Sequence, residues 1–222
     1  MEADTAFHGR LKEIQDNVVK MSESVTKAID SSIEALKKRD LRLAHHVIAD
    51  DAEINKQRFN IENQCIQLNA SQHLSTGDFT VVVAILNIIT ELERIGDYAD
   101  GIANIVVMIG DEPPLKPLID IPRMAELTVN MVNKSIQAFI SRDVQSARQA
   151  VTMDDVVDGL YDQVFRELLT FMMTDSKTIN RATHLIWVAH NLERAADRAT
   201  NICECVVFLI TGEMEEIGGS KY

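Results

Sequence analysis

The sequence contains few of the residues that interrupt helices. Among its 222 residues are only 9 glycines and 4 prolines, and aromatic residues make up 5% of the chain. Apolar residues still make up 46%, which is enough for hydrophobic cores. Because glycine and proline are the strongest local breakers of regular structure, this composition predicts long helices and no strands.

Cysteines, leader-like segments and long hydrophobic runs are also scarce. Three cysteines, Cys65, Cys203 and Cys205, form no disulfide framework and favour a reducing compartment. The first ten residues are polar and acidic, whereas a signal peptide begins with a basic region. The longest apolar run, residues 81–89, is far shorter than the roughly 20 residues needed to span a bilayer. These absences predict a cytoplasmic protein with no direct membrane insertion.

Basic residues are fewer than acidic ones. The chain has 22 Lys and Arg residues against 34 Asp and Glu, a net charge of −12. This balance argues against nucleic acid and anionic membranes as partners, and against direct capture of free anions. The sequence also shows no nucleophile–base arrangement and no glycine-rich loop that could cradle a phosphate, so we expect no enzyme activity.

The chain contains one helical pattern twice. Residues 92–109 read LERIGDYADGIANIVVMI, and residues 192–209 read LERAADRATNICECVVFL. Both copies place apolar or small residues at spacings of three and four, which predicts a helix with one buried seam. The duplication extends further, since the pattern of residues 32–40 returns at 135–143. Each of these segments is followed by a seam of residues seven apart. That seam is Val47, Ile54, Ile61 and Leu68 in the first copy and Ala150, Val157, Val164 and Phe171 in the second.

Three of the 4 prolines lie between the copies, in residues 111–117, and predict a linker. We therefore expect an all-α protein of two sequence-related three-helix bundles with six long helices, residues 1–112 and 118–222, each able to fold alone. In the first bundle, Asp40 is the predicted N-cap of the second helix. Residues 73–78 are the predicted turn, and the third helix is expected from Phe79.

Rows of acidic and amide residues lie beside the seams: Asp51, Asn55, Glu93 and Asp97 in the first copy, and Asp154, Asp158, Glu193 and Asp197 in the second. Each row contains oxygen-bearing side chains at i and i+4, where like charges repel by a few tenths of a kcal/mol, roughly, so we expect a cation beside them. Hard cations prefer several oxygen ligands of this kind. The alternative is that these residues occupy outer heptad positions as ordinary solvated charge. Both interpretations place the rows on outer faces of the bundles.

The segments LERIGDYADGIANI and NLERAADRATNICECVVFLITGE resemble the paired signatures of the PhoU family, regulators of bacterial and archaeal phosphate uptake. The resemblance covers almost the whole chain. It implies that Glu/Asp-x-x-x-Asp motifs bind multinuclear metal clusters, with iron or zinc as candidate ions. The implied metal ligands are Asp51, Glu93, Asp97, Asp154, Asp158, Glu193 and Asp197, with Asn55 and Asp100 as further oxygen donors. Two departures weaken the match: Asn55 is neutral, and Arg198 beside the second row is expected to neutralise it in place of a metal.

The resemblance also implies a regulator of phosphate uptake and phosphate-starvation signalling. Its implied partners are the ATP-binding subunit of a phosphate ABC transporter and a sensor histidine kinase, with a homodimer as a further option. Two other interpretations stay open: a helical adaptor without a metal role, and a ferritin-like di-iron enzyme. The second is disfavoured because such enzymes need Glu-x-x-His, which this chain lacks, and because the acidic rows are expected outside the seam.

Overall fold

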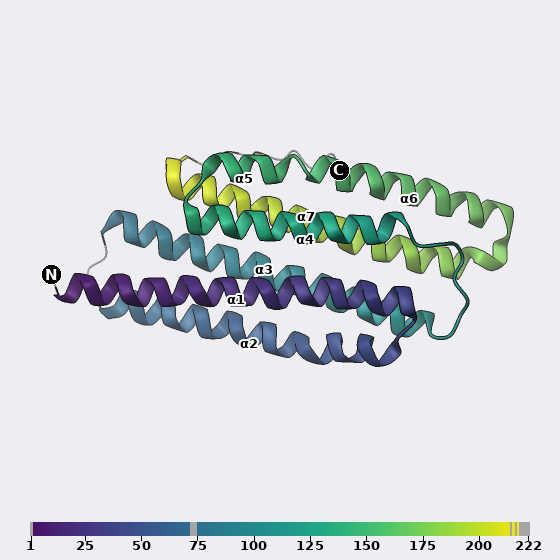
Figure 1. Cartoon of the computed structure of the whole chain (residues 1–222), viewed down its shortest axis with the longest axis horizontal. Coiled ribbons are helices and arrows are strands. Elements are labelled where there is room, and N and C mark those ends of the chain that lie inside the picture. Colours follow the sequence, from purple (N-terminus) through teal and green to yellow (C-terminus); the bar gives the residue numbers. More distant parts are fainter. Residues whose placement is uncertain (1, 72–74, 214, 216, 218–222) are drawn as a thin grey trace.

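The first half of the chain is a bundle of three long helices (Figure 1). In this computed structural model, residues 2–71, 75–213, 215 and 217 are described. The helices of this half are α1 (Glu2–Lys38), α2 (Leu41–Ser71) and α3 (Thr76–Ile109). Within the described ranges there is no strand, which confirms the expected all-α class.

The second half repeats this arrangement with one difference. Its elements are α4 (Asp120–Ser141), α5 (Val144–Val151), α6 (Asp154–Thr174), a 3₁₀ turn η1 (Ser176–Thr178) and α7 (Ile179–Thr211). The sequence predicted one continuous helix where α5 and α6 stand. These two helices together take the place of α2, so the duplicated three-helix layout is confirmed with its middle helix interrupted at residues 152–153.

Local hydrogen bonds accompany the interruption. The Thr152 hydroxyl donates to the carbonyl of Gln149 at 2.8 Å, a bond that competes with the helix ladder. The amide of Met153 bonds three residues back, to Ala150, at 3.1 Å. Asp154 and Asp155 then lie in the first turn of α6, where the helix dipole favours negative charge.

Side-chain caps set the ends of other helices. Asp40 Oδ1 accepts hydrogen bonds from the amides of Arg42 and Leu43, both at 3.0 Å, which confirms it as the N-cap of α2. Ser75 caps α3 by accepting from the amide of Asp78 at 3.2 Å, so this helix begins at Thr76 rather than at Phe79. Of the predicted turn at 73–78, residues 73 and 74 lie outside the described part.

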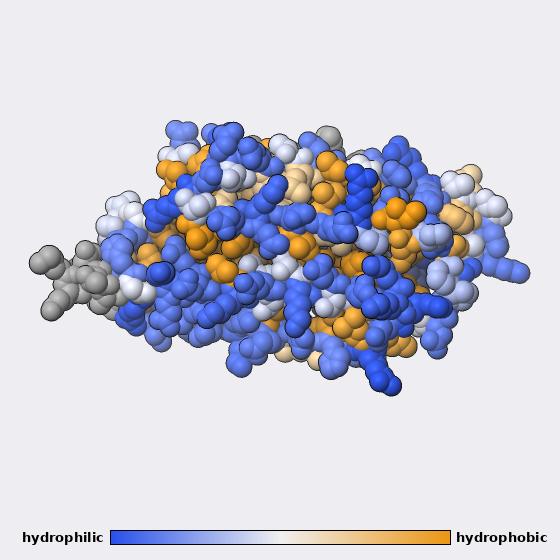
Figure 2. Space-filling model, in the orientation of Figure 1, coloured by the Kyte–Doolittle hydropathy of each residue, from blue (hydrophilic) through white to orange (hydrophobic). Residues whose placement is uncertain are grey.

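One hydrophobic cluster joins the two halves. The predicted seam residues of α2 are all buried, as are their counterparts Ala150, Val157 and Val164, while Phe171 is half-buried. Between the halves, α3 packs along α7 and α1 lies beside α4 (Figure 1). Figure 2 shows hydrophobic residues along the line where α1 and α4 meet. That each half folds alone remains a prediction.

Polar contacts fix how α3 and α7 align. Arg198 Nη1 and Asn201 Nδ2 of α7 donate to Glu91 Oε2 of α3, at 3.4 and 3.2 Å. Gly101 of α3 faces Asn191, and a Cβ added to this glycine would lie 3.2 Å from Asn191 Nδ2. The Asn191 side chain therefore occupies the space that a side chain at position 101 would need. None of the described helices combines the length and the apolar character needed to cross a membrane.

The same substitution at two helical glycines is expected to have opposite effects on stability. At Gly101, Leu would push α3 away from Asn191 and lower the free energy of unfolding by about 1–3 kcal/mol. At Gly159 of α6 no atom lies within 4 Å of an added Cβ, so Leu should raise it by up to about 1 kcal/mol through helix propensity. Urea unfolding of Gly101→Leu and Gly159→Leu measures both; equal effects would contradict the tight α3–α7 contact.

Candidate metal centres

The first acidic cluster lies between α2 and α3. It comprises Asp51 and Asn55 from α2, and Glu93, Asp97 and Asp100 from α3. Gly96 of α3 permits the close approach of these helices because it has no side chain. A Cβ at this position would lie 3.3 Å from side-chain carbons of Ile54 and 3.6 Å from Asp51 Oδ1.

Crowding and burial make these carboxylates harder to ionise. Burial raises the pKa of Asp97 to about 6, with further increases from the charges of Glu93, Asp51 and Asp100 and a partial offset from Arg58. The pKa of Asp51 is raised by burial and then by Glu93. That of Asp100 is raised by burial and then by Asp51. A cation placed among them would reverse this effect.

Neighbouring donors already engage part of the first cluster. The Asn55 amide donates to Asp51 Oδ2 at 2.9 Å, and Arg58 Nη1 donates to Glu93 Oε1 at 3.1 Å. Asp51 Oδ1 is buried and has no hydrogen-bond partner. Asn55 therefore acts here as a donor to its carboxylate neighbour, whereas the sequence suggested an additional oxygen ligand.

The second cluster repeats the first between α6 and α7. Asp154 and Asp158 of α6 face Glu193 and Asp197 of α7, and the charges of Asp158 and Asp197 raise the pKa values of both Asp154 and Glu193. Burial, followed by the charges of Asp158 and Asp197, raises the pKa of Asp154 to about 7. Burial, followed by the charge of Asp197, raises the pKa of Glu193 also to about 7. Asp154 Oδ1 and Glu193 Oε2 are buried without a hydrogen-bond partner.

The expected position of the acidic rows on outer faces is wrong for most of their members. Glu193 is only 8% exposed, and the side chains of Glu93 and Asp197 are 17% and 15% exposed. Asp97 alone among the α3 and α7 ligand candidates is exposed to solvent, and its carboxyl is still partly desolvated by its neighbours. The reason is that α3 and α7 each pack against the helices of their own half and against each other, so residues beside the seam are also covered.

Each cluster contains an arginine that the sequence analysis did not assign to it. Arg194 Nη1 lies 2.6 Å from Asp197 Oδ2. Arg198, the expected neutralising residue, instead bonds Glu91 of α3, so that expectation is wrong. The spacing of Arg194 and Asp197, at i and i+3 on one helix face, was the available signal.

The donor chemistry suits a hard cation, although the side chains are not yet arranged around one. Throughout the described residues, no three His, Cys, Asp or Glu side chains are placed to hold a single ion. Three buried carboxylate oxygens nevertheless lack a hydrogen-bond partner, one in the first cluster and two in the second, although Glu193 Oε2 lies 3.5 Å from His190 Nδ1. Because unsatisfied buried oxygens are unfavourable, these are the oxygens in each cluster that a cation would satisfy.

A duplicated helical bundle with matching acidic clusters in its two halves defines a class of tandem-repeat, carboxylate-bearing proteins. The sequence model of the PhoU domain matches residues 18–106 and 121–206, one copy in each half. The chain therefore belongs to the PhoU family.

Relatives and solved structures agree with this assignment. A protein of Aquifex aeolicus described as a phosphate-specific transport system accessory protein PhoU homolog is 40% identical over 204 residues, covering 92% of each chain. The crystal structure of PhoU from Pseudomonas aeruginosa has a TM-score of 0.89 at 29% identity and covers 93% of this chain and 100% of that one. A phosphate transport system regulatory protein PhoU from Streptococcus pneumoniae has a TM-score of 0.87 at 27% identity, covering 95% and 99%.

The raised pKa values predict that the metal-free protein is less stable at higher pH. Ordinary carboxyl groups have a pKa of about 4, whereas the folded chain raises the pKa values of Asp154 and Glu193 to about 7. Between these values the folded state binds more protons than the unfolded state, so stability falls as pH rises through this window. We expect chelator-treated protein to melt at a higher temperature at pH 5.5 than at pH 7.5.

Replacing Glu193 by Gln removes one of these groups while nearly preserving its shape, and should reduce the pH dependence of the melting temperature. The matched control is Glu13→Gln, at an exposed carboxylate of α1, which should leave the dependence unchanged. An equally steep dependence in the Glu193→Gln protein would show that the second cluster does not produce it.

Proposed function

We propose that this protein is an accessory protein of a phosphate-specific transport system, acting in the cytoplasm to regulate phosphate uptake and phosphate-starvation signalling. The observation that carries the proposal is the match to relatives with that description over nearly their whole length, with one PhoU domain in each half. Fold, repeat and acidic clusters all accord with it.

The regulatory action would be exerted through protein contacts. The proposed partners are the ATP-binding subunit of a phosphate ABC transporter and a sensor histidine kinase. A net charge of −12 steers the chain toward basic partner surfaces. Contact area is available along α6, where Phe165, Leu169 and Met173 recur every four residues and are 38%, 38% and 88% exposed. Such an apolar row at helical spacing is suited to packing against another protein.

Metal binding at the two acidic clusters is the second part of the proposal. Asp51, Glu93 and Asp97 would hold an ion between α2 and α3, and Asp154, Asp158, Glu193 and Asp197 would hold one between α6 and α7. The donors are almost all oxygen, which suits iron better than zinc, since zinc usually takes His or Cys ligands. A bound cation would neutralise the crowded carboxylates and tie neighbouring helices together.

The remaining interpretations carry less support. A helical adaptor without metal would leave without a role the three buried carboxylate oxygens that lack a hydrogen-bond partner. A ferritin-like di-iron enzyme gains plausibility from the burial of Glu193, because the acidic residues do not lie outside the packed helices as the sequence suggested. It still lacks the Glu-x-x-His motif that such centres use.

Two double variants at repeat-related positions test the metal proposal. Glu193→Ala with Asp197→Ala should remove metal from the second cluster only, and Glu93→Ala with Asp97→Ala from the first only. Elemental analysis of protein purified without added metal is expected to show a partial loss in each variant. Unchanged metal content in both would refute the assignment. If Ala substitution unfolds the bundle, Glu193→Gln with Asp197→Asn replaces it and removes charge at nearly constant volume.

Partner binding and gene deletion test the regulatory proposal. The chain should co-purify with the transporter ATPase, the sensor kinase or both. Binding should weaken as salt rises from about 50 to 500 mM, because the Debye length shortens several-fold over that range. Deleting the gene should leave the phosphate-starvation response active when phosphate is plentiful, and restoring the wild-type chain should repress it. Normal repression in the deletion strain, with neither partner captured, would remove the support for this function.

A further inference from the structure

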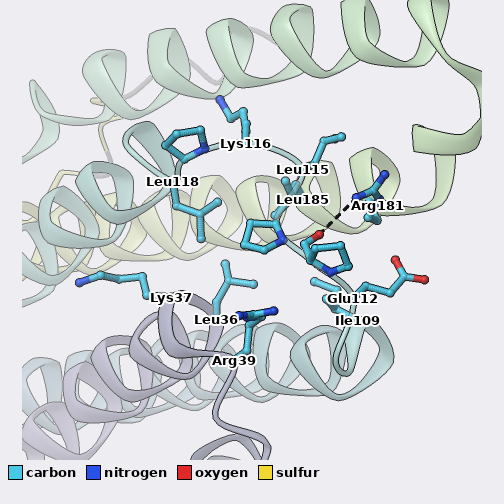
Figure 3. Close-up of a pocket in the computed structure, with 13 residues that line it drawn as sticks. Leu36, Lys37, Arg39, Ile109, Glu112, Leu115, Lys116, Leu118, Arg181 and Leu185 are labelled. Carbon is cyan, nitrogen blue, oxygen red and sulfur yellow. Dashed lines mark hydrogen bonds between the residues drawn. The ribbon is translucent and has the colours of Figure 1, made fainter.

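A pocket of about 340 Å³ lies at the end of the molecule where the proline-containing linker passes from one half to the other (Figure 3). Its walls come from three segments that are far apart in sequence. These are the last turn of α1 with the residue after it, the linker itself, and the early turns of α7. Neither acidic cluster contributes to it.

The interior of the pocket is apolar. Leu36 of α1 and Leu185 of α7 are each only 6% exposed, and the half-buried Leu115 and Leu118 come from the linker. In Figure 3 the side chains of Leu36 and Leu118 extend toward one another across the space. An apolar body placed here would contact leucines from both halves of the chain.

The charge around this pocket is opposite to that of the whole chain. Lys37, Arg39, Lys116 and Arg181 line it against a single acidic residue, Glu112, although the chain carries a net charge of −12. The Lys116 ammonium is engaged by Glu167 of α6, and Lys37 Nζ lies 3.2 Å from Glu34.

Two arginines keep unused donors at the pocket. Arg39 is exposed and forms no ion pair with any residue that the structure describes. Arg181 donates from Nη1 to the carbonyl of Pro113 at 3.3 Å, a single bond from a group with five donors. The mouth of the pocket therefore carries uncompensated positive charge.

The linker is held in place before any ligand arrives. The Lys116–Glu167 ion pair anchors it to α6, and the Arg181–Pro113 hydrogen bond anchors it to α7. Its three prolines restrict the backbone further. A site preorganised in this way loses little conformational freedom on binding.

We propose that this pocket binds a small amphipathic anion, with its apolar body on the leucines and its carboxylate, sulfonate or phosphate group at Arg39 and Arg181. The pocket volume lies in the range of small-molecule sites, about 300–1,000 Å³. The planar arginine guanidinium can donate two hydrogen bonds at once to two oxygens of such an anionic group. The inference does not depend on the proposed regulatory function or on metal binding.

Fluorescent titration of the full chain with 8-anilinonaphthalene-1-sulfonate tests the proposal. The neutral probe N-phenyl-1-naphthylamine has the same ring system without the sulfonate. We expect saturable binding of the sulfonate at one site. Arg39→Gln with Arg181→Gln should weaken it at least about fivefold while changing the affinity of the neutral probe by less than about twofold. Circular dichroism checks that the variants are folded.

The matched control is Arg142→Gln. Arg142 is the repeat counterpart of Arg39, and both have the left-handed conformation, with φ of 52° and 56°. Arg142 caps the C-terminal end of α4, and the turn from α4 to α5 lies at the opposite end of the molecule from the linker (Figure 1). This variant removes the same charge and should bind the sulfonate like the wild type. Equal weakening by Arg142→Gln, absence of saturable binding, or equal loss of both probes would overturn the proposal. If the double variant is unfolded, Arg39→Gln alone decides, with an expected loss of at least about twofold.

Discussion

The packing of α3 against α7 is the contact on which the rest of this structure depends. Each of these helices is the third of its own bundle, and each also forms the boundary with the other half. They are therefore covered on most sides, and polar residues on them must find partners within the protein. Glu91 with Arg198 and Asn201, and Asp197 with Arg194, are the result. The acidic clusters exist in their half-buried form because this packing leaves so little of α3 and α7 facing water.

Burial gives the carboxylates three ways to avoid an unfavourable charge. They can take up a proton, accept a hydrogen bond from an amide or arginine, or bind a cation. Raised pKa values at Asp97, Asp154 and Glu193 favour the first, and Asn55, Arg58 and Arg194 supply the donors for the second. All three act on neighbouring carboxylates of the same two clusters, so each changes the charge that the others meet. Metal affinity at these sites would therefore depend on pH and on how readily the two arginines move into solvent.

Helix periodicity and duplication could be predicted from the sequence because they depend on local spacing. The seam from Val47 to Leu68 and the cap at Asp40 follow from side-chain pattern and backbone hydrogen bonding alone. The burial of Glu193 could not be predicted, because a seam defines one packed face and does not indicate that a second bundle covers another. The linker pocket was missed for a related reason: net charge averages over the whole chain, while charges act over about 8 Å in physiological salt.

The contacts between the halves have a consequence for how the duplication can be read. Position 91 of α3 meets position 201 of α7, and position 101 meets position 191, so corresponding sites cross-pair as they do in a twofold dimer. The residues at these sites have diverged: Glu91 and Gly101 in one copy, Asn191 and Asn201 in the other. Two first halves joined in this way would set Glu91 against a glycine, leaving a carboxylate with no donor at that position. The interface therefore has the pairing of a twofold dimer, but its polar contacts form only between one first half and one second half.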